Sequence, residues 1–261
     1  MKTEARSLFD LSGHVALITG ATSGLGFATA TALATQGATV IVSGLDEAAC
    51  SETATRLCQS GLNAFGIACD VSDQRQVEQL VGEVLQRHGR IDTLVCNAGI
   101  QGPAGPFSNV TDDTWLRVME VNLHSAARLT SLVIPDMAQR GSGSVILMSS
   151  IAGLRGNRRI GLYGISKAGL AQLARNLAVE WGPHGVRVNA ISPGLIRTPF
   201  AAELIADSTF MSRRLSLTPL RRVGEPHEIA GVAVMLASPA GGFMTGQNIV
   251  VDGGTTISDG S

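Results

Sequence analysis

The only tyrosine of the chain, Tyr163, lies four residues before Lys167, and the only other lysine is Lys2. Residues four apart on a helix share one face, so the phenol and the ammonium are within reach of each other. A neighbouring positive charge favours the phenolate and lowers a pKa that is otherwise about 10. The pair therefore predicts a phenol that acts as general acid or base near neutral pH. A core or surface tyrosine with an incidental neighbour would have the same spacing.

A glycine-rich turn near the N-terminus is the second feature that suggests chemistry. The segment Thr19–Gly26 follows the apolar run Val15–Thr19 and opens a helical pattern. Glycine lets the backbone turn sharply and approach a diphosphate, and the N-terminus of the following helix favours the negative charge. This context predicts a dinucleotide-binding turn rather than an ordinary tight turn.

The elements that would position these residues alternate along the chain. Short runs rich in β-branched residues are apolar throughout, which is typical of parallel strands covered on both faces. We predict strands over Val15–Thr19, Val40–Ser43, Leu94–Cys96, Val145–Ser149, Val188–Ile191 and Ile249–Val251, a weaker strand near Ala64–Cys69, and helices over 25–36, 47–60, 73–88, 112–139, 162–181 and 226–237. This alternation predicts an α/β fold: a Rossmann-like, doubly wound, seven-stranded parallel sheet with helices on both faces.

No linker or internal repeat divides the chain, so we interpret residues 1–261 as a single dinucleotide-binding and catalytic domain. The segment 194–222 fits the alternation least well, because it contains Pro199 and Pro219 and has weak helical periodicity. Ligands of open α/β sheets bind at the carboxyl ends of the strands, and this segment directly follows one. We expect a substrate loop or lid here, with a surface excursion that has no role as the alternative.

Composition argues against several classes of partner. The net charge of −1 and an aromatic content of 4% give no reason to expect nucleic acid. The sequence contains no run of 18 apolar residues, so we expect no membrane span. The segment Met1–His14 lacks the apolar core of a signal peptide. The four cysteines and five histidines lack ligand spacing, so we expect no metal site and a reduced, cytoplasmic setting.

Several short motifs occur in an order and at spacings that are specific in combination. They are Thr19–Gly26 with its G-x-x-x-G-x-G spacing, Asp70-Val71, Asn97-Ala98-Gly99, Asn122, Ser150, Tyr163-x-x-x-Lys167, and Pro193-Gly194 with Thr198. In these motifs the chain resembles the classical short-chain dehydrogenases/reductases over nearly its whole length. The resemblance implies an NAD(P)-dependent oxidoreductase that interconverts a secondary alcohol and a ketone by hydride transfer.

The resemblance implies four catalytic residues. Tyr163 would give a proton to the carbonyl oxygen or take one from the alcohol, and Lys167 would lower its pKa and bind the nicotinamide ribose. Ser150 would hydrogen-bond the substrate oxygen, and Asn122 would help to hold a proton-relay water. Alternation along the strand points the neighbouring Ser149 elsewhere.

The resemblance also implies the residues that bind the cofactor. The glycine turn would contact the diphosphate, and the segments after later strands would contact the adenosine and the nicotinamide. These residues are Gly20, Ser23, Gly24, Leu25, Gly26, Gly44, Asp70, Val71, Asn97, Ala98, Gly99, Tyr163, Lys167, Pro193, Gly194, Ile196 and Thr198.

The choice between NAD and NADP depends on the end of the second strand. An acidic side chain there favours NAD, and a basic one favours NADP. Gly44 and Leu45 occupy the two decisive positions, and Ser23 replaces a frequent basic residue in the glycine turn. Asp46 lies two residues beyond the usual acidic position and is suited to cap the next helix. The sequence therefore favours neither cofactor.

The substrate would be a small carbonyl or alcohol compound. Candidate contacts are Gln101, Ser150, Ala152, Arg155 and Tyr163. Arg155, with the nearby Arg158 and Arg159, could bind an anionic substrate, but we favour solvated surface charges or subunit contacts.

Other functions remain open at this point. Within the family they are a 3-oxoacyl-thioester reductase and a sugar or sugar-acid dehydrogenase. A catalytically silent nucleotide-binding sensor or scaffold is the alternative from another class, and the complete catalytic set argues against it. The helices over 112–139 and 162–181 carry more apolar surface than one sheet face requires. Members of the family pair these helices between subunits, so we expect a homotetramer.

Overall fold

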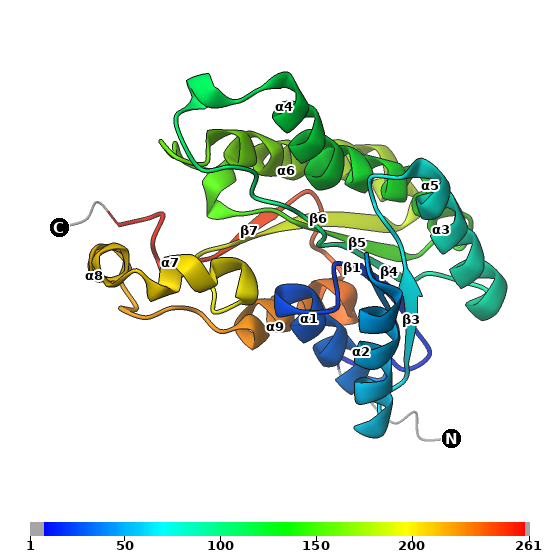
Figure 1. Ribbon diagram of the computed structural model, residues 1–261. Helices are drawn as coiled ribbons and strands as arrows, with labels where there is room; N and C mark the ends of the chain where they lie inside the picture. Colours follow the sequence, from blue (N-terminus) through cyan, green and yellow to red (C-terminus); the bar gives the residue numbers. More distant parts are fainter. Residues whose placement is uncertain (1–7, 259–261) are drawn as a thin grey trace.

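Seven parallel strands form one sheet at the centre of the computed structural model, which describes residues 8–258 (Figure 1). The strands are β1 (Val15–Thr19), β2 (Thr39–Gly44), β3 (Ala64–Ala68), β4 (Thr93–Cys96), β5 (Gly143–Met148), β6 (Val186–Pro193) and β7 (Asn248–Val251). Their order in the sheet is β3-β2-β1-β4-β5-β6-β7, and every pairing is parallel. The predicted doubly wound sheet is confirmed. Lys2 and the start of the Met1–His14 segment lie outside the described residues, as do residues 259–261.

Helices cover both faces of the sheet, as Figure 1 shows. One face packs against α1 (Gly24–Thr35), α2 (Glu47–Gln59) and α9 (Pro226–Ala237), and the other against α3 (Gln74–His88), α5 (Ser125–Gln139) and α6 (Gly161–Trp181). Successive residues of a strand point to opposite faces of the sheet. In β1, Leu17 packs on the side of α3, α5 and α6, Ile18 packs on the side of α1, α2 and α9, and both are fully buried. Burial on both faces explains why the strands are apolar throughout.

The helix predicted over 112–139 is confirmed in its extent, but it is not α-helical throughout. It consists of α4 (Asp112–Met119), a π-helical segment η2 (Glu120–His124) and α5. Such π-helical insertions are frequently found at functional sites. Asn122 lies in this segment and bonds to the backbone of Ile100, a contact distant in sequence that a local pattern cannot reveal.

The segment 194–222, called the lid here, is more regular than its sequence indicates. It contains the 3₁₀ turn η5 (Pro199–Ala201), the helix α7 (Ala202–Ala206) and the helix α8 (Ser208–Ser216). Asp207 caps α8 by accepting a hydrogen bond from Phe210 N. The lid lies at the carboxyl end of β6, beside the end of β7 (Figure 1). The remaining short 3₁₀ turns are η1 (Phe107–Asn109), η3 (Ile151–Gly153), η4 (Gly182–His184) and η6 (Pro239–Gly241).

Candidate active site

The glycine turn between β1 and α1 has the geometry that close approach to a ligand requires. Gly20 and Gly24 have φ values of 62° and 56°, in the left-handed region that favours glycine. A Cβ on Gly26 would lie 2.2 Å from Gly20 O, so no side chain fits there. The Asn97 side chain donates hydrogen bonds to Thr19 O at 3.0 Å and Gly20 O at 2.9 Å. Asn97 therefore fixes the shape of the turn.

The N-terminus of α1 offers backbone N–H groups to an anion. Ser23 is the N-cap residue, and its side chain makes no capping hydrogen bond to the helix. No acidic residue lies in the first turn, which begins with Gly24 and Leu25. Backbone N–H groups that no side chain caps can donate hydrogen bonds to a diphosphate, with help from the helix dipole. The turn and the helix start thus fit the diphosphate of a dinucleotide.

The end of β2 carries no charge that would select a cofactor. A Cβ on Gly44 would lie 3.0 Å from Thr22 Cγ2, and Leu45 is 75% exposed. Asp46 caps α2, because its carboxylate accepts a 2.7 Å hydrogen bond from Ala49 N. The capping role suggested by its position in the sequence is confirmed.

Asp70 and Val71 follow β3 at the same edge of the sheet. The Asp70 carboxylate accepts hydrogen bonds from Ser72 N at 2.9 Å and Ser72 Oγ at 2.7 Å, which closes the turn before α3. Val71 is buried in the core that α3, α5 and α6 share. The structure therefore gives both residues a local structural role beside the expected cofactor contact.

The start of the lid returns to the glycine turn. A Cβ on Gly24 would lie 3.5 Å from Thr198 Cβ, so residues far apart in sequence lie side by side here. Ile196 is buried and forms an isolated bridge with Gly224. Gly194, which follows Pro193 at the end of β6, has no room for a side chain, because a Cβ would lie 2.7 Å from Asp252 Cα.

Ser150 reaches the site at the end of β5, where η3 packs against α6. Its Oγ accepts a 3.1 Å hydrogen bond from Ala152 N. The approach to α6 is close, since a Cβ on Gly164 would lie 2.7 Å from Ala152 O. Ser149 points away and donates from its Oγ to Lys167 O at 2.7 Å. The strand alternation predicted for the two serines is confirmed.

Tyr163 lies in the first turn of α6, and its ring centroid is 6.1 Å from that of Phe200 in the lid. The sequence predicts that Lys167 lowers the pKa of this phenol. Instead, burial raises the pKa of Tyr163 to about 12, and an interaction with the Ser150 side chain acts weakly in the opposite direction. The prediction of a lowered pKa is wrong, because loss of hydration disfavours the phenolate more than the surroundings favour it.

Lys167 is a neighbour of the tyrosine, as the spacing predicts, but its ammonium is held by the backbone. Its Nζ lies 5.5 Å from the Tyr163 ring centroid and donates a 2.8 Å hydrogen bond to Met148 O. The side chain is 3% exposed, and burial lowers its pKa to about 8. Burial thus moves the two pKa values in opposite directions, and both groups are protonated at pH 7.

Asn122 connects the loop after β4 with α6. Its Oδ1 accepts from Ile100 N at 2.7 Å, and its Nδ2 donates to Ile100 O at 2.8 Å and to Ser166 Oγ at 3.0 Å. Ser166 Oγ donates in turn to Tyr163 O at 2.8 Å. Ser166 therefore positions the helix that carries the tyrosine, a role that the sequence reasoning missed because no motif marks it.

The space above Gly99 is where the candidate side chains converge. A Cβ on Gly99 would lie 3.2 Å from Asn122 Oδ1 and 3.3 Å from Lys167 Nζ. The backbone N–H of the preceding Ala98 donates to Thr19 Oγ1 at 3.2 Å, so this segment also borders the glycine turn. Asn122 and Lys167 thus lie next to the segment that borders the glycine turn.

The candidate substrate contacts adjoin these residues along the chain. Ala152 adjoins Ser150 in η3, and Gln101 follows Ile100, whose backbone bonds to Asn122. Arg155 is exposed and lies between Ser150 and Tyr163 along the chain. Within residues 8–258, no group of three His, Cys, Asp or Glu side chains could hold a metal ion, and no helix is long and apolar enough to cross a membrane.

Comparison with known proteins gives one consistent result. Residues 20–256 match a family model described as enoyl-(acyl carrier protein) reductase. The human protein Dehydrogenase/reductase SDR family member 4 is 37% identical over 245 residues, which cover 94% of this chain and 88% of the human one.

Solved structures agree with the sequence relatives. A gluconate 5-dehydrogenase from Burkholderia cenocepacia, in complex with NADP and tartrate, superposes with a TM-score of 0.93 at 33% identity, over 96% of this chain and 98% of the other. A 7α-hydroxysteroid dehydrogenase complexed with NADH and 7-oxo glycochenodeoxycholic acid gives a TM-score of 0.90 at 35% identity, over 95% and 96% of the two chains. On these matches, the chain belongs to the short-chain dehydrogenase/reductase family of oxidoreductases.

Proposed function

We propose that this protein is an NAD(P)-dependent oxidoreductase that interconverts a secondary alcohol and a ketone, with Tyr163 as general acid and base. The observation that carries the proposal is the convergence of Asn122 and Lys167 above Gly99, beside a glycine turn shaped for a diphosphate. A protein that only binds nucleotide needs the glycine turn but not the convergence of Asn122 and Lys167.

The dinucleotide would lie across the carboxyl edge of the sheet. Residues that fit it are Gly20, Ser23, Gly24, Leu25 and Gly26 at the diphosphate, Gly44, Asp70, Val71, Asn97, Ala98 and Gly99 along the adenosine, and Pro193, Gly194, Ile196, Thr198, Tyr163 and Lys167 at the nicotinamide end. Bound there, it supplies or accepts the hydride and, when oxidised, adds a positive charge close to the catalytic side chains.

The chain's own residues would carry out the proton transfer. With a pKa of about 12, the Tyr163 phenol keeps its proton at pH 7 and can give it to a carbonyl oxygen held by Ser150. Lys167, protonated at pH 7 and fixed by Met148 O, provides a positive charge near the resulting phenolate. Alcohol oxidation needs the reverse transfer, so we expect it to become faster as the pH rises.

Both NAD and NADP are proposed as cofactors. Gly44 and Leu45 place neither an acidic nor a basic side chain at the ribose position. The related gluconate 5-dehydrogenase was solved with NADP and the 7α-hydroxysteroid dehydrogenase with NADH.

Two narrower substrate assignments have support. The likeness to a gluconate 5-dehydrogenase favours a sugar-acid substrate, and the description of the matching family model favours an acyl thioester.

We also propose that the chain works as one catalytic domain, as a homotetramer in the cytoplasm. Apolar side chains exposed on α4 and α6 support the assembly, and four free cysteines support a reduced compartment.

The proposal is tested by following nicotinamide absorbance with a panel of ketones and secondary alcohols, run in parallel with both cofactors. We expect turnover with at least one carbonyl compound. Tight binding of a cofactor without turnover of any member would instead support a sensor or scaffold.

A further inference from the structure

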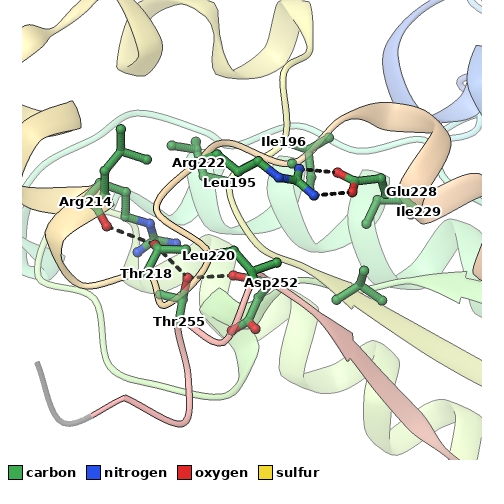
Figure 2. Close-up of a pocket in the computed structure, with 14 residues that line it drawn as sticks. Leu195, Ile196, Arg214, Thr218, Leu220, Arg222, Glu228, Ile229, Asp252 and Thr255 are labelled. Carbon is green, nitrogen blue, oxygen red and sulfur yellow. Dashed lines mark hydrogen bonds and ion pairs between the residues drawn. The ribbon is translucent and has the colours of Figure 1, made fainter.

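A cavity of about 80 Å³ lies between the lid and the residues that follow β7 (Figure 2). Its walls come from α8, from the turn after β6 that contains Leu195 and Ile196, and from the segment from Val251 to Thr255. None of Asn122, Ser150, Tyr163 and Lys167 lines it. The cavity is large enough to admit a small polar group.

Arg214 of α8 lines this cavity and is partly buried. Its Nε is enclosed by protein and makes no hydrogen bond, and no carboxylate among residues 8–258 lies within ion-pair distance of its guanidinium. By contrast, Arg222 on the same cavity is paired with both carboxylate oxygens of Glu228. An enclosed N–H group without an acceptor is costly, so a ligand that supplies an acceptor to the Arg214 Nε would be favourable.

The polar groups that Arg214 faces make hydrogen bonds to the backbone. Figure 2 shows its side chain directed from α8 toward Thr255 and Asp252. The two Asp252 carboxylate oxygens accept hydrogen bonds from Gly254 N at 2.8 Å and Thr256 N at 2.7 Å. The Thr255 hydroxyl donates to Asp252 O at 2.7 Å. Neither residue accepts a hydrogen bond from the Arg214 Nε.

A second arginine acts on the same guanidinium. Burial lowers the pKa of Arg214, the positive charge of Arg155 lowers it further, and Asp252 raises it. Arg155 belongs to the segment that connects Ser150 with Tyr163 along the chain. Two like charges repel unless an anion lies near them. Arg155, Arg214 and Asp252 together carry a net charge of +1, which one carboxylate would neutralise.

We propose that Arg214 and Arg155 bind a carboxylate of the substrate, so that the enzyme acts on hydroxy acids and oxo acids. The inference rests on the proposed function, since the oxygen that reacts would lie at Tyr163 while the carboxylate lies at the arginines. A substrate carboxylate would give the Arg214 Nε the acceptor that it lacks, and a guanidinium can bind a carboxylate in a bidentate manner.

The test compares oxo acids of four to six carbons with their methyl esters as substrates. We expect the wild-type protein to prefer the acids, and Arg214→Gln to lower the acid-to-ester ratio of kcat/KM about 10- to 100-fold, mainly through KM. Arg155→Gln should lower it less, because its charge is exposed and screened. The control is Arg213→Gln, which removes an exposed arginine from the same helix and should leave the ratio unchanged. Equal losses for acids and esters, or an unchanged ratio in Arg214→Gln, would overturn the inference.

A second measurement does not depend on turnover. At millimolar concentration the acids should raise the melting temperature of the wild-type protein and of Arg213→Gln but not of Arg214→Gln, and the esters should raise none. If the acids stabilise Arg214→Gln as well, the inference fails even when the enzyme is active. If neutral ketones are reduced but the acids neither bind nor react, the proposed function stands and the carboxylate site does not.

A third variant tests whether Arg214 has only a structural role. Because its Nε is enclosed without an acceptor, Arg214→Met should keep or raise the melting temperature. A clear fall in the melting temperature would show that the guanidinium supports α8, which would contradict a binding role.

Discussion

At the scale of single residues, burial decides the properties of the two groups that the proposed reaction uses. It raises the pKa of Tyr163 to about 12 and lowers that of Lys167 to about 8. The i,i+4 spacing in the sequence reveals that the two side chains are neighbours, but spacing cannot reveal depth or the acceptor at Met148 O. Adjacency was therefore predictable, and the direction of the tyrosine shift was not.

The buried lysine predicts an unusual dependence of stability on pH. The ordinary pKa of lysine is 10.5, and that of folded Lys167 is about 8. Between these values the unfolded chain binds more protons than the folded one, so stability due to this residue rises with pH. Below pH 8 the buried charge lowers the stability by its full amount.

Replacing this lysine should therefore stabilise the fold. We expect Lys167→Met to increase the free energy of unfolding at pH 7 by about 2 kcal/mol, since the charge is removed while the bond to Met148 O is lost. The gain should shrink between pH 8 and 10.5. Urea unfolding at pH 7 and pH 9.5, at one protein concentration, measures both effects. A variant less stable than the wild type at pH 7 would contradict the account.

At the scale of elements, the glycine turn tests whether shape alone controls cofactor binding. In Gly26→Ala the new Cβ would meet Gly20 O at 2.2 Å, so the turn must distort. We expect cofactor affinity, measured by fluorescence titration, to fall at least about tenfold, a loss on the order of 1.4 kcal/mol.

A matched control exists on α3. Gly82 lies in that helix with nothing within 4 Å of a new Cβ, so Gly82→Ala should leave affinity unchanged and stabilise the helix by roughly 0.5–1 kcal/mol. Equal affinities in Gly26→Ala and the wild type would show that the turn does not hold the cofactor.

Element positions follow from local patterns where burial is uniform, and they fail where distant contacts intervene. The strand predicted over Val15–Thr19 has those same bounds, because both of its faces are covered. The π-helical segment Glu120–His124 contains Asn122, whose bonds to Ile100 join residues distant in sequence, so a local pattern does not reveal it. Arg214 has no local signal, because its burial depends on how α8 packs against the segment after β7.

At the scale of the whole molecule, the open question is what covers α4 and α6. Leu116 on α4 is 65% exposed and Val179 on α6 is 81% exposed, on the face that the sheet does not use. In Figure 1 the two helices lie together on the outer layer. Exposed apolar side chains on neighbouring helices are typical of subunit interfaces.

We predict a sedimentation mass four times the chain mass of 27.0 kDa. Leu116→Glu should lower this mass, because a charge in an apolar interface loses its hydration. Leu8 has the same exposure of 65% but lies near the N-terminus, so Leu8→Glu should leave the mass unchanged. A monomeric wild-type protein would refute the homotetramer.

The central claim is that Tyr163 handles the proton of the reaction, and Tyr163→Phe tests it most directly. Removing one hydroxyl should lower kcat about 10²- to 10⁴-fold, the usual contribution of general acid–base catalysis. Phenylalanine keeps the ring that packs near Phe200, so cofactor affinity should stay nearly unchanged. The measurement is nicotinamide absorbance with the best substrate of the panel, together with a cofactor titration. Turnover close to that of the wild type would contradict the account.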